Sequence, residues 1–415
     1  MPRTNTVIIG GGQAGLALSH CLSALAIDHV VMERGKLAQR WRSQSWDSLH
    51  LLTPNWMTRL PGFHYDGDDA DGFMSVRELI ALFERYAATF RPPLLTETSV
   101  QSVDARSTGY RVATSRGTWV ADSVVVATGS CDLPFVPDVS RGLASSITQI
   151  VPAEYRRPDQ LPAGGVLVVG ASATGVQLAD EIQRSGRQVT LAVGHHTRLP
   201  RRYRGHDILW WLDGAGILNR RVDAEARHHR RPSLQLVGKP DHSSLDLAAL
   251  HASGVRLVGR VQEIDGHRVR IADDLAATTA AADIKMADLL MRIDDHIARH
   301  RLAAPGPEAF TPTRPLASAT PRVLDLKDER ITTVVWATGY RRAYPWLRVP
   351  VLDAHGEIAH VDGETRMPGL YVLGFNFQRR LNSGFIDGVG ADASVIAGKI
   401  ERSIPRGPVA QARVA

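Results

Sequence analysis

The sequence predicts an α/β fold made of two similar units, the second of which is inserted into the first. A pattern of apolar strand, glycine-rich turn, amphipathic helix and second strand occurs twice, over residues 6–33 and again over residues 165–193. A further pair of apolar segments, residues 123–129 and 333–339, ends in Ala-Thr-Gly both times. With 415 residues, the chain has room for two or three domains of about 150 residues each.

Proline-rich stretches indicate where the chain passes between the two units. They lie at residues 134–137, 152–162 and 305–321. We therefore expect residues 1–155 and 325–415 to form a discontinuous first domain, with residues 160–324 as the second. Within the second domain, residues 273–302 are alanine-rich and predict a helical insertion, whereas residues 220–232 are charged and expected to be exposed.

Composition excludes several classes of protein. Hydrophobic residues make up 44% of the chain, yet no run of about 18 apolar residues could span a bilayer, and the N-terminus lacks a signal peptide. We expect a cytoplasmic protein. The formal charge of +6 is spread along the chain without an RNA-binding pattern, so no nucleic-acid partner is expected. Cys21 and Cys131 form no CxxC motif, which disfavours a disulfide framework or a metal site.

The first glycine turn, Gly10-Gly11-Gly12-Gln13-Ala14-Gly15, follows a strand and opens a helix. This context is typical of a Rossmann dinucleotide-binding fingerprint. Gly10 allows the tight turn, Gly12 allows close approach of a pyrophosphate, Gly15 allows helix and strand to pack closely, and the helix N-terminus at Gln13 and Ala14 offers free N–H groups. Glu33 ends the next strand, where its carboxylate would bind a ribose diol and repel a 2′-phosphate. The alternative is a tight turn in another α/β protein with Glu33 on its surface.

The second turn, Gly170-Ala171-Ser172-Ala173-Thr174-Gly175, has the same context, with Ser172 in place of the middle glycine. Glu33 lies 23 residues after Gly10, and the same offset from Gly170 reaches Val193, which is followed by Gly194. No carboxylate meets the ribose there. Guanidinium groups, which suit a 2′-phosphate, follow instead. They belong to Arg198, Arg201, Arg202 and Arg204. The pattern favours NADPH over NADH, with a solvated basic loop as the alternative.

With both turns placed, the chain resembles the class B flavin-dependent monooxygenases, the flavin-containing, N-hydroxylating and Baeyer–Villiger group. The resemblance rests on both turns, on residues 40–42 through 60–62, on Ala337-Thr338-Gly339-Tyr340 and on residues 369–374. It implies two Rossmann-like FAD/NAD(P)-binding domains of the three-layer ββα type, with FAD at Gly10 and NADPH at Gly170. It also implies a single-component monooxygenase that forms a flavin C4a-(hydro)peroxide with dioxygen and oxygenates a small organic substrate.

The same resemblance implies further cofactor contacts outside the two turns. These are Arg34, Arg40, Trp41, Thr128, Gly129, Ala337, Thr338, Gly339, Gly374, Phe375, Ser383 and Gly384. Asn55 is the candidate catalytic residue near the oxygen site, with a surface-turn asparagine as the alternative. Trp41, Trp46 and Trp56 are candidates for lining the flavin pocket, although such a trio is as often plain core. The last helix would direct its N-terminus at the flavin pyrimidine ring.

One departure from the family leaves other functions open. Many members carry a phenylalanine, glycine and histidine signature between the domains, and Ser145, Ile147 and Val151 occupy those positions here. Productive use of the oxygenated flavin is therefore the less secure part of the prediction. The alternatives are a reductase, a peroxide-releasing oxidase or a halogenase on the same scaffold, and a non-catalytic nucleotide sensor. The missing CxxC disfavours a disulfide reductase.

Overall fold

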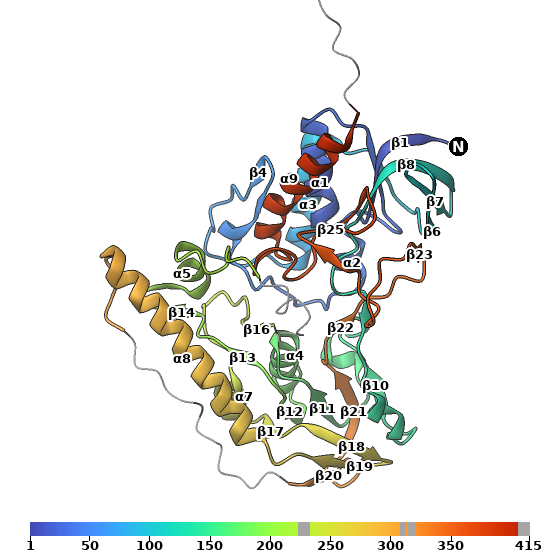
Figure 1. Ribbon diagram of the computed structural model, residues 1–415. Helices are drawn as coiled ribbons and strands as arrows, with labels where there is room; N and C mark the ends of the chain where they lie inside the picture. Colours follow the sequence, from blue (N-terminus) through green and yellow to red (C-terminus); the bar gives the residue numbers. More distant parts are fainter. Residues whose placement is uncertain (223–232, 308–312, 314–320, 406–415) are drawn as a thin grey trace, which may run out of the picture.

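The computed structural model describes residues 1–222, 233–307, 313 and 321–405. It contains two α/β units, one around β1, α1 and α9 and the other around β11, β12 and α4, with the long helix α8 along one flank (Figure 1). The predicted α/β fold with two similar units is confirmed. Within the described ranges, none of the helices combines the length and the apolar composition needed to cross a bilayer.

The first unit is built on a sheet whose parallel part has the order β5-β2-β1-β8-β26. These strands are β1 (Arg3–Ile9), β2 (His29–Met32), β5 (Leu94–Leu95), β8 (Gly117–Val126) and β26 (Leu370–Val372). The sheet is extended by β6 (Val100–Ala105), β7 (Tyr110–Thr114), β23 (Leu347–Arg348), β24 (His360–Val361) and β25 (Glu364–Thr365). The helices of this unit are α1 (Gln13–Ala24), α2 (Gln39–Ser43), α3 (Val76–Phe90) and α9 (Ile386–Ser403).

Alternating side chains of the central strand feed two cores. Ile8 of β1 packs in the cluster with α1, α3 and α9, whereas Val7 and Ile9 point into the cluster formed with β6, β7 and β8. Successive strand residues face opposite sides of a sheet, so an unbroken apolar strand is buried on both faces. The glycine turn that follows Ile9 is therefore held at the carboxyl edge of a rigid sheet.

The second unit repeats this plan with five parallel strands in the order β17-β12-β11-β21-β10. They are β10 (Thr148–Ile150), β11 (Gly165–Val169), β12 (Val189–Ala192), β17 (Arg256–Val258) and β21 (Ile331–Trp336). One face carries α4 (Ala173–Arg184) and α7 (Leu247–Ala252), and the other carries β18 (Val261–Asp265), β19 (Arg268–Ile271) and β20 (Val323–Asp325).

The second unit is longer at both ends than the sequence predicts. β10 and β21 belong to the second sheet, although they lie in ranges that the sequence predicted for the first domain. β21 pairs with β11 as β8 pairs with β1, so the two Ala-Thr-Gly segments are equivalent parts of the two units. The prolines of residues 152–162 lie in the connection between β10 and β11, inside the second unit. That unit therefore spans residues 148–336.

A helical layer connects the two units. The predicted helical insertion is present as α8 (Leu275–His300), which packs with α5 (Ile208–Gly214) and with Met57 of the first unit. The remaining short elements are η1 (Asn55–Met57), β3 (Arg59–Leu60), β4 (Phe63–His64), β9 (Leu133–Pro134), η2 (Asp138–Gly142), η3 (Pro158–Gln160), β13 (Thr197–Arg198), β14 (Arg202–Tyr203), β15 (His206–Asp207), β16 (Leu234–Gln235) and β22 (Tyr340–Arg341). Residues 223–232, most of the charged segment, lie outside the described residues.

Candidate cofactor and active site

The first glycine turn has the geometry that its sequence predicts. Gly10 has φ +116°, a value that side-chain-bearing residues rarely adopt, and its N–H donates to the Met32 carbonyl at 2.8 Å. A Cβ at Gly15 would lie 1.9 Å from the Gly10 carbonyl oxygen, which no side chain could tolerate. A Cβ at Gly12 would meet no atom within 4 Å. Protein atoms therefore pack tightly against the turn at Gly15, whereas the space beside Gly12 is open to a ligand.

The groups around this opening suit a nucleotide diphosphate. Gly12 caps α1 without a side-chain hydrogen bond, so the first N–H groups of the helix keep their capacity to bind an anion. The Glu33 carboxylate is 8% exposed and accepts from the Gly11 N–H at 2.7 Å and the Gly35 N–H at 3.0 Å. A fixed carboxylate at the end of β2 and an open, anion-binding turn fit the adenosine diphosphate part of FAD.

Two distant segments close around the first turn. A Cβ at Gly10 would lie 2.5 Å from the Ala127 carbonyl oxygen, which places Thr128 and Gly129 beside the turn. A Cβ at Gly374 would lie 2.6 Å from the Ala14 side chain, so the C-terminal segment crosses the start of α1. Thr128, Gly129 and Gly374, which are predicted to contact the cofactor, therefore lie together beside the first turn, with their backbone toward it. The Phe375 ring instead packs in the core on the other face of the sheet.

The second turn reproduces the first. Gly170 has φ +108°, its N–H donates to the Ala192 carbonyl at 3.0 Å, and a Cβ at Gly175 would lie 1.8 Å from the Gly170 carbonyl oxygen. Ser172 caps α4 without a side-chain bond, and Thr174 lies in the first turn of this helix. Ala337 lies beside Gly170 as Ala127 lies beside Gly10. This second helix N-terminus is equally ready for a phosphate.

Thr338 and Gly339, which follow Ala337, face the strand that returns from the first unit. The Thr338 hydroxyl donates to the Phe135 carbonyl, and the Phe135 N–H donates to the Gly339 carbonyl at 2.8 Å. The two residues therefore fasten the crossing between β9 and β22. If Thr338 and Gly339 contact a cofactor as predicted, they would do so with their backbone atoms.

The ends of the two equivalent strands differ as expected. Val193, at the position of Glu33, is fully buried, and Gly194 follows it. The Arg260 side chain lies 3.7 Å from the position of a Gly194 Cβ, is half-exposed and donates to Asp274. His195 is exposed, whereas burial lowers the pKa of His196, which is then neutral at neutral pH. The polar groups at this end are His195 and the Arg260–Asp274 pair, and an apolar side chain, Val193, occupies the position of Glu33.

The structure corrects the predicted set of phosphate-binding arginines. Arg198 is 11% exposed and pairs with Asp246 and Asp283, both at 2.7 Å. Arg201 is 1% exposed and pairs with Asp207 at 2.5 Å. Arg204 pairs with Asp294 at 2.8 Å. Because these guanidinium groups are bonded to carboxylates of the protein, they are not available for the predicted contact with a 2′-phosphate, and they do not form the alternative, a solvated basic loop.

Arg202 is the exposed member of the set. Its side chain donates to the Gly205 carbonyl at 2.7 Å, across the turn between β14 and β15.

Arg34 and Arg40 lie together near the first turn. Arg40 contacts Asp132 at 3.4 Å and Arg34 contacts it at 3.8 Å, and the Nη1 of Arg40 is buried without a partner. An unpartnered buried guanidinium N–H is a donor that a ligand could use. This makes Arg40 the stronger of the two predicted cofactor contacts.

The three tryptophans do not form one pocket. Trp41 packs against the core of the first unit, Trp46 lies in the core of the second, and Trp56 packs with α5 and α8. Trp46 is a buried core residue, whereas Trp41 and Trp56 are partly buried at the edges of their clusters, and their place beside a flavin stays a prediction. Trp56 keeps one unusual feature, since its indole N–H is buried without a hydrogen-bond partner.

Asn55 is buried, which contradicts the surface-turn alternative, whereas its role near the oxygen site stays a prediction. Its side-chain oxygen accepts from the Met74 N–H at 2.9 Å, and its amide donates to the Asp69 carbonyl at 2.9 Å. The side chain thus fastens the loop of residues 69–74 from inside. It is not a surface-turn asparagine, and its carbonyl oxygen is already hydrogen-bonded within the protein.

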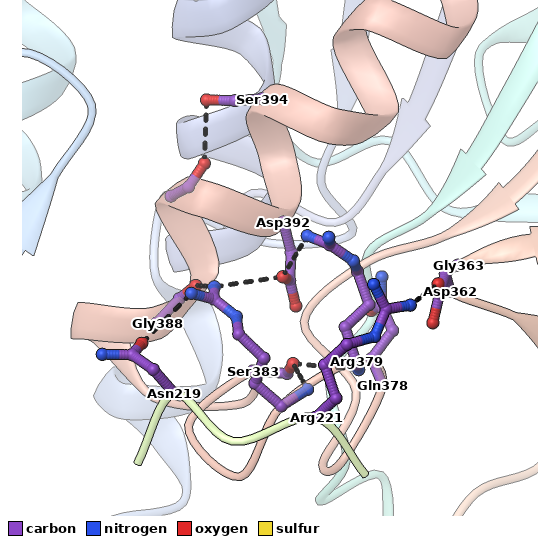
Figure 2. A network of polar contacts seen from close by, with 12 residues as sticks. Asn219, Arg221, Asp362, Gly363, Gln378, Arg379, Ser383, Gly388, Asp392 and Ser394 are labelled. Atoms are coloured by element: carbon purple, nitrogen blue, oxygen red, sulfur yellow. Dashed lines mark hydrogen bonds and ion pairs between the residues drawn. The ribbon is translucent and has the colours of Figure 1, made fainter. Parts of the chain in front are cut away.

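The segment before α9 is held by a buried ionic network (Figure 2). Asp392 is fully buried and accepts from Arg379 at 3.0 Å and from Arg380 at 3.1 Å. The Ser383 hydroxyl accepts from the N–H groups of both arginines, so its side chain fixes this segment. Gly384 packs closely against the Asn376 side chain.

The same network reaches the second unit. Arg380 donates to Asn219 at 3.2 Å, and Arg221 pairs with Asp362. Residues 218–222 therefore run beside the segment that precedes α9.

Sequence reasoning missed two residues near the second turn. Gln235 is 1% exposed, its amide donates to the Ala171 carbonyl, and its side-chain oxygen has no partner. Arg260 lies 66 residues after Gly194. Neither residue belongs to a motif, and only the pairing of β12 with β17 brings Arg260 to the end of β12. No sequence signal would have found them.

The chain is similar to several known proteins. The family described as pyridine nucleotide-disulphide oxidoreductases matches residues 7–212. A CzcO-like oxidoreductase of Geobacillus kaustophilus is 30% identical over 95% of this chain and 98% of its own. Rice indole-3-pyruvate monooxygenase YUCCA1 is 27% identical over 89% of this chain and 86% of its own.

A solved structure shares the whole architecture. The flavin-containing monooxygenase from Stenotrophomonas maltophilia has a TM-score of 0.68, with 18% identity over 97% of this chain and 99% of its own. Its fold is thus that of the present chain from end to end. The family and these neighbours imply FAD and NADPH as cofactors. The chain belongs with the CzcO-like oxidoreductases.

Proposed function

We propose that the protein is a single-component flavin monooxygenase that takes its electrons from NADPH and inserts one oxygen atom of dioxygen into a small organic substrate. One observation carries the proposal: two matched turns differ at the end of the following strand, with Glu33 in one unit and Val193 with Gly194 in the other. A carboxylate accepts a ribose diol, whereas its absence admits a 2′-phosphate.

The chain's own residues bind and orient in this proposal. Glu33 holds the adenosine ribose of FAD, and the N-termini of α1 and α4 bind the two pyrophosphates. Arg40 supplies its free guanidinium N–H to the flavin nucleotide. Bound FAD supplies the redox and oxygen-activating chemistry.

Arg260 is the proposed contact of the 2′-phosphate, in place of Arg198 and Arg201. Its aliphatic stem lies beside Gly194, with Cγ 3.7 Å from the position of a Gly194 Cβ, and its side chain is half-exposed. We expect Arg260→Ala to raise the KM for NADPH by about tenfold and to leave the KM for NADH nearly unchanged. Arg256→Ala is the control, because Arg256 lies at the start of β17, away from the strand end that Arg260 follows, and pairs with a carboxylate as Arg260 does. Equal changes for both nucleotides would contradict this assignment.

Asn55 is proposed to act on the site through the loop of residues 69–74. An Asn55→Ala variant would then lose thermal stability together with activity. Loss of activity at full stability, with peroxide released instead of product, would restore a direct role at the oxygen site.

Isotope incorporation tests the monooxygenase proposal. The reaction is run with NADPH under ¹⁸O₂ against a panel of amines, sulfides, ketones and keto acids, including indole-3-pyruvate, after which the rice relative is named. We expect one substrate class to gain a single ¹⁸O atom. If the amount of hydrogen peroxide released equals the NADPH consumed with every compound, the protein is an oxidase instead. The sequence names this alternative because Val151 stands where many family members carry a histidine.

A further inference from the structure

Arg201 is a fully buried arginine that the proposed chemistry does not use. It lies just before β14, and 1% of its side chain is exposed. Its Nη1 donates to the Leu52 carbonyl at 2.7 Å, its Nη2 donates to the Asp207 carboxylate at 2.5 Å, and the guanidinium lies 4.9 Å from the centre of the Phe73 ring. A charge buried this deeply is costly unless its partners are well placed.

Those partners come from both units. Asp207 belongs to the second unit, where its carboxylate also caps α5 by accepting from the Leu209 N–H at 2.8 Å. Leu52 and Phe73 belong to the first unit. Arg201 therefore joins the start of α5 to the chain that leads from Leu52 into η1.

The contact leaves little room for the two units to slide. A Cβ at Gly238 would lie 2.2 Å from the Leu51 carbonyl oxygen and 2.7 Å from the Phe73 side chain. Beyond Leu52, Trp56 packs in the same cluster as Phe385, the residue that caps α9. The segment held by Arg201 therefore reaches the start of α9, at the boundary of the two units.

We propose that Arg201 is a positioning residue for flavin reduction, because it fixes Leu52–Trp56 of the first unit against the second. This inference rests on the proposed function. The step it serves transfers a hydride, one proton with two electrons, from dihydronicotinamide to oxidised flavin. The rate of such a transfer would depend steeply on the distance between the two nucleotides, which turns of different units would hold. The guanidinium donates to the Leu52 carbonyl through Nη1 and to Asp207 through Nη2, and these directional bonds join the two units in a way that an apolar side chain could not.

The test compares Arg201→Met and the double variant Arg201→Met/Asp207→Asn with Arg187→Met. The double variant removes the buried carboxylate charge that the single change would leave unpaired, while asparagine still caps α5. Arg187 is the matched control, since it also donates to backbone carbonyls, those of Leu161 and Pro162, but within one unit.

Two readouts are required. In the cofactor-free protein, hydrogen exchange of the peptide over residues 49–57 should rise in the Arg201 variants and stay unchanged in Arg187→Met. In anaerobic stopped flow with NADPH, the limiting rate of flavin reduction should fall by about 10- to 100-fold, while the Kd for NADPH changes by less than about threefold. A purely structural role would lower the melting temperature or the flavin content without this split between rate and affinity.

The outcomes separate the inference from the function on which it rests. If wild-type flavin is not reduced by NADPH or NADH, the proposed function fails. If wild type is reduced and the double variant, with flavin bound, is reduced equally fast, only the role of Arg201 is overturned.

Discussion

At the scale of single residues, the last glycine of each turn is under the tightest steric constraint in the two sites. An added Cβ at Gly15 would lie 1.9 Å from the Gly10 carbonyl oxygen and one at Gly175 would lie 1.8 Å from the Gly170 carbonyl oxygen, both far shorter than a van der Waals contact of carbon with oxygen. The helix must move away from the strand to admit even a methyl group. That movement would widen the turn and withdraw the helix N-terminus from its phosphate.

The two glycines give a matched pair of variants. We expect Gly15→Ala to purify with little FAD, and Gly175→Ala to retain FAD but bind NADPH weakly, each at a cost of about 1–3 kcal/mol in unfolding free energy. Flavin absorbance after gel filtration and a nucleotide titration measure the two effects. If Gly175→Ala lost FAD while Gly15→Ala kept it, the assignment of the cofactors to the turns would be reversed.

Glu181 is the residue whose ionisation bears on contact between the units. It lies on α4, and its carboxylate accepts from the Ser48 hydroxyl of the first unit at 2.8 Å. Burial raises the pKa of Glu181, and the nearby carboxylates of Asp47 and Asp180 raise it further, against the hydrogen bond from Ser48 that lowers it. The folded protein therefore holds this proton more tightly than the unfolded chain does.

The sign of this pKa shift gives a pH-dependent prediction. Its stabilising contribution is complete below the ordinary glutamate pKa and is lost as pH rises through the raised value. We expect Glu181→Gln to be at least as stable as wild type at pH 7, with the difference shrinking toward pH 4, as measured by urea unfolding across that range. The control is exposed Glu154→Gln. A variant less stable than wild type at pH 7 would mean that the ionised carboxylate stabilises the fold.

At the scale of elements, α9 is anchored more by charge than by its caps. Its N-cap, Phe385, makes no side-chain hydrogen bond, whereas Asp392 inside the helix binds both Arg379 and Arg380. The two arginines belong to the segment that leads into the helix. Asp392 thus sets where α9 begins, and with it the direction of the helix N-terminus.

Removing that carboxylate should be severe. Asp392→Ala would leave two buried guanidinium groups without their shared partner, and we expect a loss of about 3–5 kcal/mol in unfolding free energy. Chemical denaturation measures it, with exposed Glu401→Ala on the same helix as the control. A loss no larger than that of the control would show that the arginines find other partners at no cost.

At the scale of the whole molecule, periodic and duplicated features were predictable and long-range partners were not. Both turns, both Ala-Thr-Gly segments and the helix α8 follow from local patterns, because strands and helices impose repeats of about 2 and 3.6 residues. The predicted domain boundaries are wrong because proline-rich stretches also occur within the second unit, where β10 and β21 pair in the second sheet. The similarity between residues 123–129 and 333–339 already indicates that β8 and β21 are equivalent strands of the two units.

The misassigned arginines illustrate the limit most clearly. Arg198 and Arg201 follow the second fingerprint at a spacing suited to a phosphate, but the carboxylates that bind Arg198 lie 48 and 85 residues further along. No local pattern reports a partner at that distance. Arg260, by contrast, carries no motif and reaches the end of β12 only through the sheet.

The account's central claim is that one chain holds two unequal nucleotides, FAD at Gly10 and NADPH at Gly170. Anaerobic titration of the purified protein with NADPH and with NADH, followed by flavin absorbance, tests it most directly. We predict one FAD per chain, bleached by about one equivalent of NADPH, with much slower reduction by NADH. A protein that binds no flavin, or whose flavin neither nucleotide reduces, would contradict the account.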